Sequence, residues 1–485
     1  MSSAQRVPGS RRATGPRRPV PGGGAVLGVL LLALAAAAVL LTGTAEPAPR
    51  QTAGARTLVD SALLACPSTQ DVRLGRVTTR VVAGLADVRP AGEPLGDSGE
   101  LLVGEPGRAG EPLDLARGAL EELPSDPTGP APVLDASGDL AAGLFGDRTD
   151  SSDTAGAVAA CRAPRGSWWF TGAGASLDHA SDLVMTNLDP GQAVVDVRLH
   201  GPEGTIDTVG TRDIPIGAGE TVTLSLADLA PQTEELTVEV AAARGRVSAA
   251  VLDRYAARPG AAAGLEWLPA TQRPSRNLRL AGIPSAGASR TLLVTNPSEL
   301  EALVEVEVVG ANGSFAPTGL DQVSVAPGAV ESVPLDDVLP AGEPLALRVR
   351  SRVPLVAAVR TVGTGPGADN SYAGPVLPLL DPAAVPVPAR ATTTVQLSAG
   401  SQPARATLTG YAADGKETGS DEVAIGPGAT AAWEPPTGSA YVVVTPLEGS
   451  VYGAATYAGR GILAQTPLAE LPMRVRTPSV RPGPR

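Results

Sequence analysis

Short stretches in which apolar and polar residues alternate recur along the C-terminal two thirds of the chain. In the clearest stretch the apolar side chains of Val195, Val197 and Leu199 are separated by charged ones. A period of two places the apolar side chains on one face of a half-buried β-strand. His200 continues the polar set at the end of this stretch and is predicted to face solvent. Many Gly and Pro residues punctuate such stretches as turns, so the pattern predicts an all-β fold.

The same pattern is repeated along the chain. The segment LVMTNLDPGQAVVDVRLHGPEG, which begins at Leu183, aligns without a gap with LLVTNPSELEALVEVEVVGANG, which begins at Leu292. A third and shorter copy follows about 100 residues later, where VAIGPGATAAW aligns with the region of Pro327 and Gly328. Each copy offers five to seven short strands, which is typical of tandem immunoglobulin-like β-sandwich modules. A β-propeller is the alternative way to close such strands.

These alignments divide the C-terminal part into β-sandwich repeat 1 at 166–270, repeat 2 at 276–380 and the shorter repeat 3 at 386–470. The connectors between them are rich in proline, which lacks a backbone donor and favours extended conformations. We therefore expect semi-rigid linkers and modules that stand in a row. Residues 471–485 are basic and are predicted to form a disordered tail.

Residues 66–165, which contain both cysteines, form an acidic, turn-rich region that we expect a disulfide to close. This region is predicted to be an irregular, disulfide-closed cap on the first sandwich rather than a module with its own core. The segment LARGALEEL, which begins at Leu115, is its one short helical candidate.

The N-terminus carries targeting information instead of a fold. Residues 1–24 are basic, and residues 25–45 contain the uncharged apolar run Ala25–Leu41, followed by a linker at 46–65. The run is slightly longer than the apolar core of a signal peptide and just long enough for a spanning helix. We expect a transmembrane signal-anchor, with a cleaved signal peptide as the alternative. Because basic residues stay in the cytoplasm, the protein is predicted to be a single-pass protein of the cell membrane whose C-terminal region is extracytoplasmic.

Charge and cysteine content agree with export. The formal net charge is −12, and the chain after residue 50 carries 32 basic against 49 acidic side chains. A surface this acidic repels phosphate backbones, so nucleic acid is not an expected partner. Cys66 and Cys161 both lie on the predicted outer side, where disulfides persist, and we expect them to pair. Two free thiols are the alternative.

Three adjacent aromatic residues, Trp168, Trp169 and Phe170, follow the second cysteine. In a strand, Trp168 and Phe170 point to one face and Trp169 to the other. We expect the first two to have a structural role, filling the core of the first sandwich against the disulfide. Trp169 on the opposite face is the candidate binding residue, as a platform for a sugar or a protein partner.

Catalytic and metal sites find little support. The segment GDSGE at Gly96 resembles the nucleophile loop of trypsin-like proteases, but in that fold the histidine base precedes the serine, whereas His179 and His200 both follow it. The carboxylates of DRTDSSD, from Asp147, lack the ordered pattern of a calcium loop and predict a solvated loop. No catalytic residue, metal ligand or cofactor is therefore predicted, and the chain is not expected to be an enzyme.

The segments AVAACRAPRGSWWFTGAGAS and LVMTNLDPGQAVVDVRLHGPEG, the apolar N-terminus and a second TNP-containing copy ending in PLVAAVR together carry a family resemblance. Over residues 60 to 465 the chain resembles an uncharacterised actinobacterial family, a domain of unknown function often encoded near a cell-wall glycosyltransferase. The resemblance implies an envelope protein and supplies no catalytic residues. We expect a non-catalytic scaffold or binding protein in cell-envelope biogenesis, with envelope proteins or glycans as partners. An enzyme acting on envelope glycans and an adhesin are the alternatives.

Overall fold

The computed structural model describes most of the chain after the N-terminal segment, namely residues 56–68, 75–85, 98–123, 126, 129–271, 273–285, 287, 289–340, 342–364, 368–459 and 461–476. The predicted basic segment, the signal-anchor, the first part of the linker at 46–65 and the end of the tail lie outside these residues. Within the described part, no helix is long and apolar enough to cross a membrane. Residues Thr57–Val475 form one compact unit.

The all-β prediction is confirmed. The described residues form several small antiparallel sheets, and their only helical elements are the 3-10 turn η1 (Gly138–Leu140) and the single-turn helix α2 (Leu226–Leu229). A separate two-stranded sheet pairs β1 (Arg56–Leu58) with β37 (Arg474–Arg476).

Repeat 1 consists of two sheets that face each other across a core. The first sheet has the order β13 (Gly204–Ile206), β12 (Ala193–Gly201), β16 (Leu236–Arg244), β10 (Ser167–Ala173) and β19 (Ala270–Thr271), with β14 (Ile214–Ile216) beside β12. The second has the order β15 (Thr221–Ser225), β11 (His179–Thr186), β17 (Ser248–Tyr255) and β18 (Gly264–Trp267). The alternating residues Val195, Val197 and Leu199 of β12 all point into the core between these sheets.

Repeat 2 has matching strands, which are β20 (Ser275–Ile283), β21 (Ser289–Thr295), β22 (Ala302–Gly310), β23 (Gly313–Phe315), β24 (Val323–Val325), β25 (Val330–Pro334), β26 (Leu345–Val362) and β27 (Asn370–Ala373). Its strand β26 runs through both layers and joins them into one eight-stranded sheet. In repeat 1 the corresponding strands β16 and β17 are separated at Gly245, whose φ is 77°. Residues 345–362 contain no glycine, so nothing interrupts the extended backbone there.

Repeat 3 again has two sheets. They contain β28 (Ala383–Pro386), β29 (Thr392–Ala399), β30 (Ala404–Tyr411), β31 (Glu417–Ile425), β32 (Thr430–Trp433), β33 (Tyr441–Glu448), β34 (Val451–Gly459), β35 (Ile462–Pro467) and β36 (Ala469–Glu470). Its hydrophobic core lies between them, as in repeat 1.

The cysteine-bounded region has the same architecture, which the sequence did not predict. Its strands are β2 (Ser61–Ala65), β3 (Arg76–Val82), β4 (Leu101–Gly104), β5 (Glu111–Pro112), β6 (Leu120–Leu123), β7 (Val133–Ser137), β8 (Phe145–Ser151) and β9 (Gly156–Ala160). The sheet orders β2-β7-β4-β5 and β6-β3-β8-β9 match β10-β16-β12-β13 and β15-β11-β17-β18. The expected irregular cap is therefore wrong, because these sheets enclose a core of their own. We call this part the N-terminal repeat. The predicted helix at LARGALEEL is also wrong, since it is a turn followed by β6.

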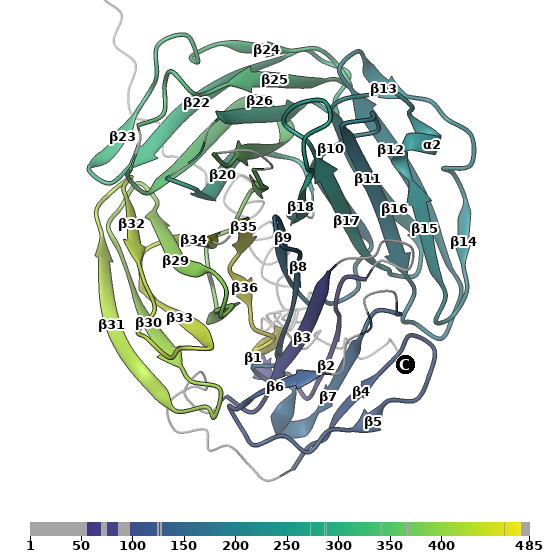
Figure 1. Ribbon diagram of the computed structural model, residues 1–485, viewed down its shortest axis with the longest axis vertical. Coiled ribbons are helices and arrows are strands. Elements are labelled where there is room, and N and C mark those ends of the chain that lie inside the picture. Colours follow the sequence, from purple (N-terminus) through teal and green to yellow (C-terminus); the bar gives the residue numbers. More distant parts are fainter. Residues whose placement is uncertain are drawn as a thin grey trace, which may run out of the picture. The chain divides into compact units, whose positions relative to one another are not determined.

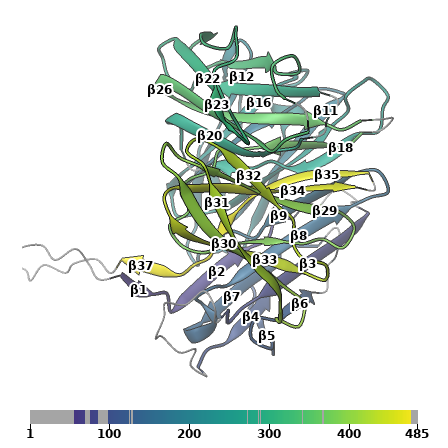
Figure 2. The ribbon, with the colours of Figure 1, turned by 90° about the vertical axis from the view of Figure 1, so that its left-hand side faces the viewer.

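The four repeats form a closed ring rather than a row (Figure 1), and Figure 2 shows the same ribbon from the side. In each repeat, the turn next to one short strand contacts a hairpin of a neighbouring repeat. The turn at β6 contacts the hairpin at the end of β30, and the turn at β15 contacts the one at the end of β4. In the same way, the turn at β25 contacts the hairpin at the end of β12, and the turn at β32 contacts the one at the end of β22. The contacts are Leu120 N–H to Ala413 O (2.8 Å), Gly219 against Gly107, His200 Nδ1 to Gly328 O (3.0 Å), and Thr430 Oγ1 to Val309 O (2.9 Å). One head-to-tail contact used four times closes a ring when its rotation allows. The expected row of modules is wrong because these turns bind neighbouring repeats.

Candidate functional site

The innermost strands of the four repeats, β9, β18, β27 and β35, meet at the centre of the ring (Figure 1). Each is the edge of its sheet, so its outer backbone groups need partners. Asp369 provides them: its Oδ1 accepts the N–H of Leu265 (2.9 Å), and its Oδ2 accepts those of Gly156 and Leu463 (2.9 Å each). The side chain of Asp369, which directly precedes β27 of repeat 2, thereby binds one residue from each of the other three repeats.

A second buried carboxylate, Glu266, completes this arrangement. It accepts the backbone N–H groups of Trp267 and Gln465, each at 3.0 Å, and is fully buried. We call Glu266 and Asp369 the carboxylate hub. Burial raises the pKa of Glu266 well above its usual value, and it raises the pKa of Asp369 to about 7 although the bound N–H groups oppose the rise. A glycosidase also uses two carboxyl groups, but the oxygens of Glu266 and Asp369 already accept hydrogen bonds from backbone N–H groups.

Another buried polar cluster lies between repeats 1 and 2. Asp253 accepts hydrogen bonds from Ser181 Oγ (2.5 Å) and Tyr372 Oη (2.8 Å) and pairs with His179 Nε2 (3.0 Å). Burial lowers the pKa of His179, but Asp253 outweighs this effect and the pKa is raised. The serine binds the aspartate instead of the histidine, so the order needed for a Ser-His-Asp nucleophile is absent from this cluster. All four side chains are buried, and the cluster fastens the two repeats together.

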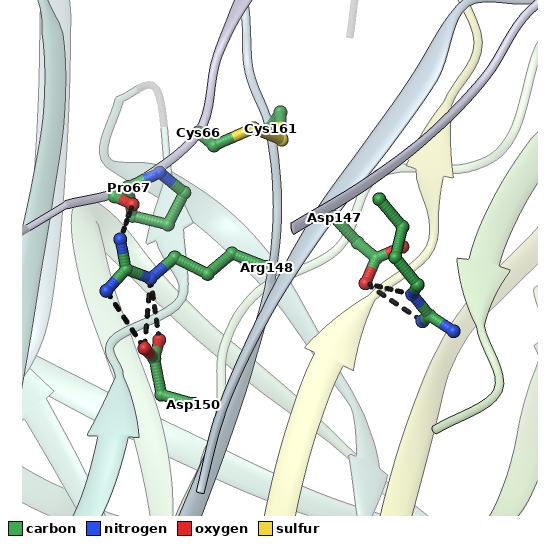
Figure 3. Close-up of a disulfide and its surroundings, with 7 residues drawn as sticks. Cys66, Pro67, Asp147, Arg148, Asp150 and Cys161 are labelled. Atoms are coloured by element: carbon green, nitrogen blue, oxygen red, sulfur yellow. Dashed lines mark hydrogen bonds and ion pairs between the residues drawn. A yellow bond between two sulfur atoms is a disulfide. The ribbon is translucent and has the colours of Figure 1, made fainter. Parts of the chain in front are cut away.

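The predicted disulfide between Cys66 and Cys161 is confirmed (Figure 3). Beside it, Arg148 binds Asp150 with its Nε and the carbonyl of Pro67 with its Nη1 (3.0 Å). Arg80 binds Asp147 at 2.9 Å, and burial raises the pKa of that aspartate. The solvated loop predicted at DRTDSSD is wrong: its first five residues belong to strand β8, where the two acids are buried and paired with arginine.

The aromatic triplet lies on β10 with its faces divided as expected. Trp168 and Phe170 are each 1% exposed and lie in the core of repeat 1. The cysteines belong to the separate core of the N-terminal repeat, so the expected packing of these rings within one core with the disulfide is not found. Trp169 is 5% exposed and stacks on His200, whose ring centroid is 5.7 Å away.

Trp169 and His200 also line a groove of about 680 Å³ between repeats 1 and 2. The prediction that His200 faces solvent is wrong, because the turn of repeat 2 covers it and accepts its Nδ1–H. Trp169 is likewise covered, so it offers little free ring face to a sugar.

A different cavity brings together the connectors between the repeats. It has a volume of about 510 Å³, within the range of small-molecule sites. Its described walls come from four connectors, which contribute Arg162 and Arg165; residues 270, 271, 273–275, 277 and 278; residues 375–377 and 379; and residues 467, 468 and 470, together with Gly453. We call it the connector pocket.

Backbone hydrogen bonds fix the walls of the connector pocket. Arg162 and Ala65 exchange both of their backbone hydrogen bonds (2.9 Å), and Leu379 N–H donates to Val451 O (2.8 Å). These bonds fix the connector at Arg162 to the N-terminal repeat and the connector at Leu379 to repeat 3.

Three arginines, Arg162, Arg165 and Arg273, line the connector pocket. Within the described part of the chain, none of them forms an ion pair with an acid. Among the described lining residues, the only carboxylate is that of Glu470, which accepts the backbone N–H of Leu380 at 2.6 Å. The guanidinium of Arg165 lies over the ring of Trp168, 5.2 Å from its centroid.

The charges in the pocket repel one another. Burial, together with the charge of Arg165, lowers the pKa of Arg162 to about 10, and burial lowers the pKa of Arg165. Both side chains nevertheless stay protonated at neutral pH. Guanidinium groups bind phosphate and carboxylate with paired hydrogen bonds, so an anion in this pocket would relieve the repulsion.

The pocket escaped detection from the sequence because its arginines are far apart in the chain. The signal that was available is RAPR at Arg162 and the RP pair at Arg273, both inside connectors. Only ring closure brings these connectors to the same place.

Comparisons with known proteins give a family but no activity. No curated protein matches the chain. A family model described as a family of unknown function (DUF5719) matches residues 124–436, which is more than half of the chain. Among solved structures, the chain is similar to Thermotoga maritima 1070, at 16% identity over 21% of this chain and 93% of that one, with a TM-score of 0.19. It is also similar to an α-L-rhamnosidase of Streptomyces avermitilis complexed with L-rhamnose, at 10% identity over 82% and 57%, with a TM-score of 0.15. Scores this low assign neither fold nor function.

Proposed function

The chain belongs to this family of unknown function, and we propose that it is a membrane-anchored extracytoplasmic protein of the actinobacterial envelope. In this proposal it binds an anionic envelope component in the connector pocket and catalyses no reaction. The apolar run Ala25–Leu41 supports the anchor. The Cys66–Cys161 disulfide supports an oxidising location outside the cytoplasm.

One observation carries the binding function, which is the set of three arginines without acidic partners in a pocket of an acidic protein. Elsewhere in the described chain many arginines are paired with acids, such as Arg80 with Asp147 and Arg360 with Glu235. Arg162 and Arg165 are half-buried, whereas Arg273 is exposed at the edge of the pocket. Partly burying a charge without a partner is costly, so proteins keep an arrangement like that of Arg162 and Arg165 where a ligand supplies the missing charge. The buried carboxylates support a non-catalytic role, because backbone N–H groups hold both hub residues.

We further propose that each repeat is a variant of the immunoglobulin-like sandwich. In repeat 1 the third strand β12 lies beside β16, and the second strand β11 lies beside β15. When the short strands β13 and β14 are counted together as the fourth strand, β15 is the fifth and β16 the sixth. These neighbours correspond to the C–F and B–E pairs of the immunoglobulin fold. The first strand β10 differs, because it lies beside β16.

The full-length protein, purified in detergent, tests the binding function by equilibrium titration with inorganic pyrophosphate and with glucuronate. We expect saturable binding of an anion that disappears in the R162Q/R165Q/R273Q variant, with uncharged glucose as the control ligand. Equal retention of glucose and of both anions, or binding that is unchanged in the variant, would contradict the proposal. Protease treatment of intact cells tests the location, since an extracytoplasmic region is digested from outside.

A further inference from the structure

The rim of the connector pocket exposes two leucines. Leu377 lines the pocket and is 74% exposed, and Leu380, three residues later, is 69% exposed. Glu470 accepts the backbone N–H of Leu380, which fixes this rim to repeat 3. Large aliphatic side chains so exposed beside a cationic pocket are suited to contact hydrocarbon.

The wall of the pocket is aliphatic as well. Among the described residues that line it, the apolar ones are aliphatic or proline, and none is aromatic. Sugar sites commonly offer an aromatic ring for stacking, so this wall is better matched to the acyl or glycerol part of an amphiphile than to a glycan. The arginines supply the complementary charge for its anionic head group.

Because the protein carries a net negative charge, an anionic ligand needs a localised cationic site on it. The chain after residue 50 carries 32 basic against 49 acidic side chains, so its net charge is repelled by an anionic bilayer. Cationic side chains near such a bilayer are attracted individually, and this attraction fades within about one Debye length. Three arginines gathered at one pocket therefore create an attractive spot on a repelled surface.

The length of chain between the proposed anchor and the folded unit sets an upper limit on the distance that it can span. Val59 N–H donates to Met473 O at 3.1 Å, and Met473 is three residues after the pocket residue Glu470. The proposed anchor ends near residue 45, and the 14 residues up to Val59 span at most about 50 Å when extended. The start of the folded unit and the pocket thus belong to the same end of repeat 3.

From these observations we infer that the connector pocket binds the phosphate-bearing head group of an anionic membrane lipid, with Leu377 and Leu380 in contact with its acyl chains. This inference rests on the proposed function, because it names the anion that the pocket takes. The phosphate lies among Arg162, Arg165 and Arg273, and no covalent step is involved.

Native mass spectrometry of the full-length protein in detergent tests this inference. The protein is titrated with phosphatidylglycerol, with phosphatidylcholine of the same acyl chains, and with soluble glycerol phosphate. We expect phosphatidylglycerol to bind at least 10-fold more tightly than either of the others, because it alone combines a net negative head group with acyl chains. Equal binding of the two lipids would overturn the inference.

Two variants separate the contributions of charge and of acyl contact. R162Q/R165Q/R273Q removes three arginine contacts and is expected to weaken phosphatidylglycerol binding on the order of 100-fold. Its control, R76Q/R212Q/R258Q, removes three exposed arginines outside the pocket and should bind like the natural protein. L377S/L380S should weaken phosphatidylglycerol binding about 10-fold and leave glycerol phosphate binding unchanged.

The outcomes distinguish this inference from the proposed function. Arginine-dependent binding of glycerol phosphate or pyrophosphate, without preference for the lipid, would retain an anion pocket and reject the lipid. Absence of arginine-dependent binding for every anion would reject both. A control variant that lost lipid binding as strongly as the pocket variant would show that net charge alone is responsible, and would also reject the site.

Discussion

The carboxylate hub contains two acidic side chains and the connector pocket contains three arginines, but the two sets differ in whether they have hydrogen-bond or ion-pair partners. In the hub, Asp369 and Glu266 are buried and accept backbone N–H groups from strands of several repeats. In the pocket, Arg162 and Arg165 are half-buried and have no acidic partner within the described residues.

This difference in partners indicates that the hub carboxylates have a structural role and that the pocket arginines are available to a ligand. Each hub oxygen has a hydrogen-bond partner, so the hub holds edge strands together and leaves little for a substrate. The pocket arginines have unused donors in a cavity, so their removal should cost binding while leaving the fold intact. Substitutions in the hub should therefore mainly lower stability, whereas substitutions in the pocket should mainly lower ligand binding.

The largest effect is expected for Asp369→Ala. The change leaves three backbone N–H groups at the centre of the ring without an acceptor. At about 1–3 kcal/mol for each of the three unsatisfied groups, the free energy of unfolding should fall on the order of 3–9 kcal/mol. Urea unfolding followed by tryptophan fluorescence measures it. The control Asp153→Ala removes an exposed carboxylate and should change stability by less than about 0.5 kcal/mol. Equal stability of the two variants would contradict a hub.

The second effect is a dependence of stability on pH. Burial raises the pKa of Asp369 to about 7 from its usual value of 3.8. The folded state therefore binds this proton more tightly than the unfolded state, and its contribution is full below pH 3.8 and lost as pH rises to 7. The loss is about 1.4 kcal/mol per pH unit, or on the order of 4 kcal/mol across this window.

Asp369→Asn isolates this contribution, since asparagine does not titrate. The stability of the natural protein minus that of the variant should decrease between pH 4 and pH 7, measured by urea unfolding at each pH. A difference that stays constant or increases over this window would show that the backbone donors keep the carboxylate ionised.

The third effect concerns the disulfide, which adjoins both regions. Cys161 follows β9, which reaches the hub, and precedes Arg162 of the pocket. Replacing both cysteines by serine should lower the free energy of unfolding by about 2–4 kcal/mol, because the unfolded chain gains freedom over a separation of 95 residues. Calorimetry of the variant and the natural protein measures the change. An unchanged melting temperature would show that the packing of the N-terminal repeat alone is sufficient.

The smallest effect on stability is expected in the pocket. R162Q/R165Q/R273Q should alter the free energy of unfolding by no more than about 1 kcal/mol, since lost packing over Trp168 is offset by relief of repulsion. The same substitution at a paired arginine, Arg80→Gln, leaves Asp147 buried alone and should cost about 3–5 kcal/mol. Comparable losses in both urea unfolding curves would mean that the pocket arginines are structural.

Local patterns predicted part of this fold. The alternation of apolar and polar residues predicted β12 and its counterpart β22, and both strands are found where expected. The prediction succeeds because a buried sheet face requires apolar residues at every second position. The N-terminal repeat carries a weaker copy, in which LDLARGALEEL from Leu113 parallels VSVAPGAVESV from Val323. This likeness was hidden because an arginine replaces the proline of the turn and the glutamates favour a helix. The turn and strand were decided by docking on repeat 3.

The candidate site was less accessible to sequence reasoning. Trp169 stands out as an aromatic residue on the face opposite the core, yet it is 5% exposed and stacks on His200. Asp369 and Arg162 attract no attention in sequence, because one lies in a glycine-rich loop and the other in a connector. Their surroundings consist of residues from other repeats.

The sequence by itself determined the strands, the repetition and the pairing of its only two cysteines, since these depend on local periodicity and on composition. Tertiary structure alone decided which turns meet, which edges are exposed and which charges are left without partners. The physical reason is that ring closure joins residues hundreds of positions apart, and the burial and pairing of a charge depend on those neighbours rather than on its place in the chain.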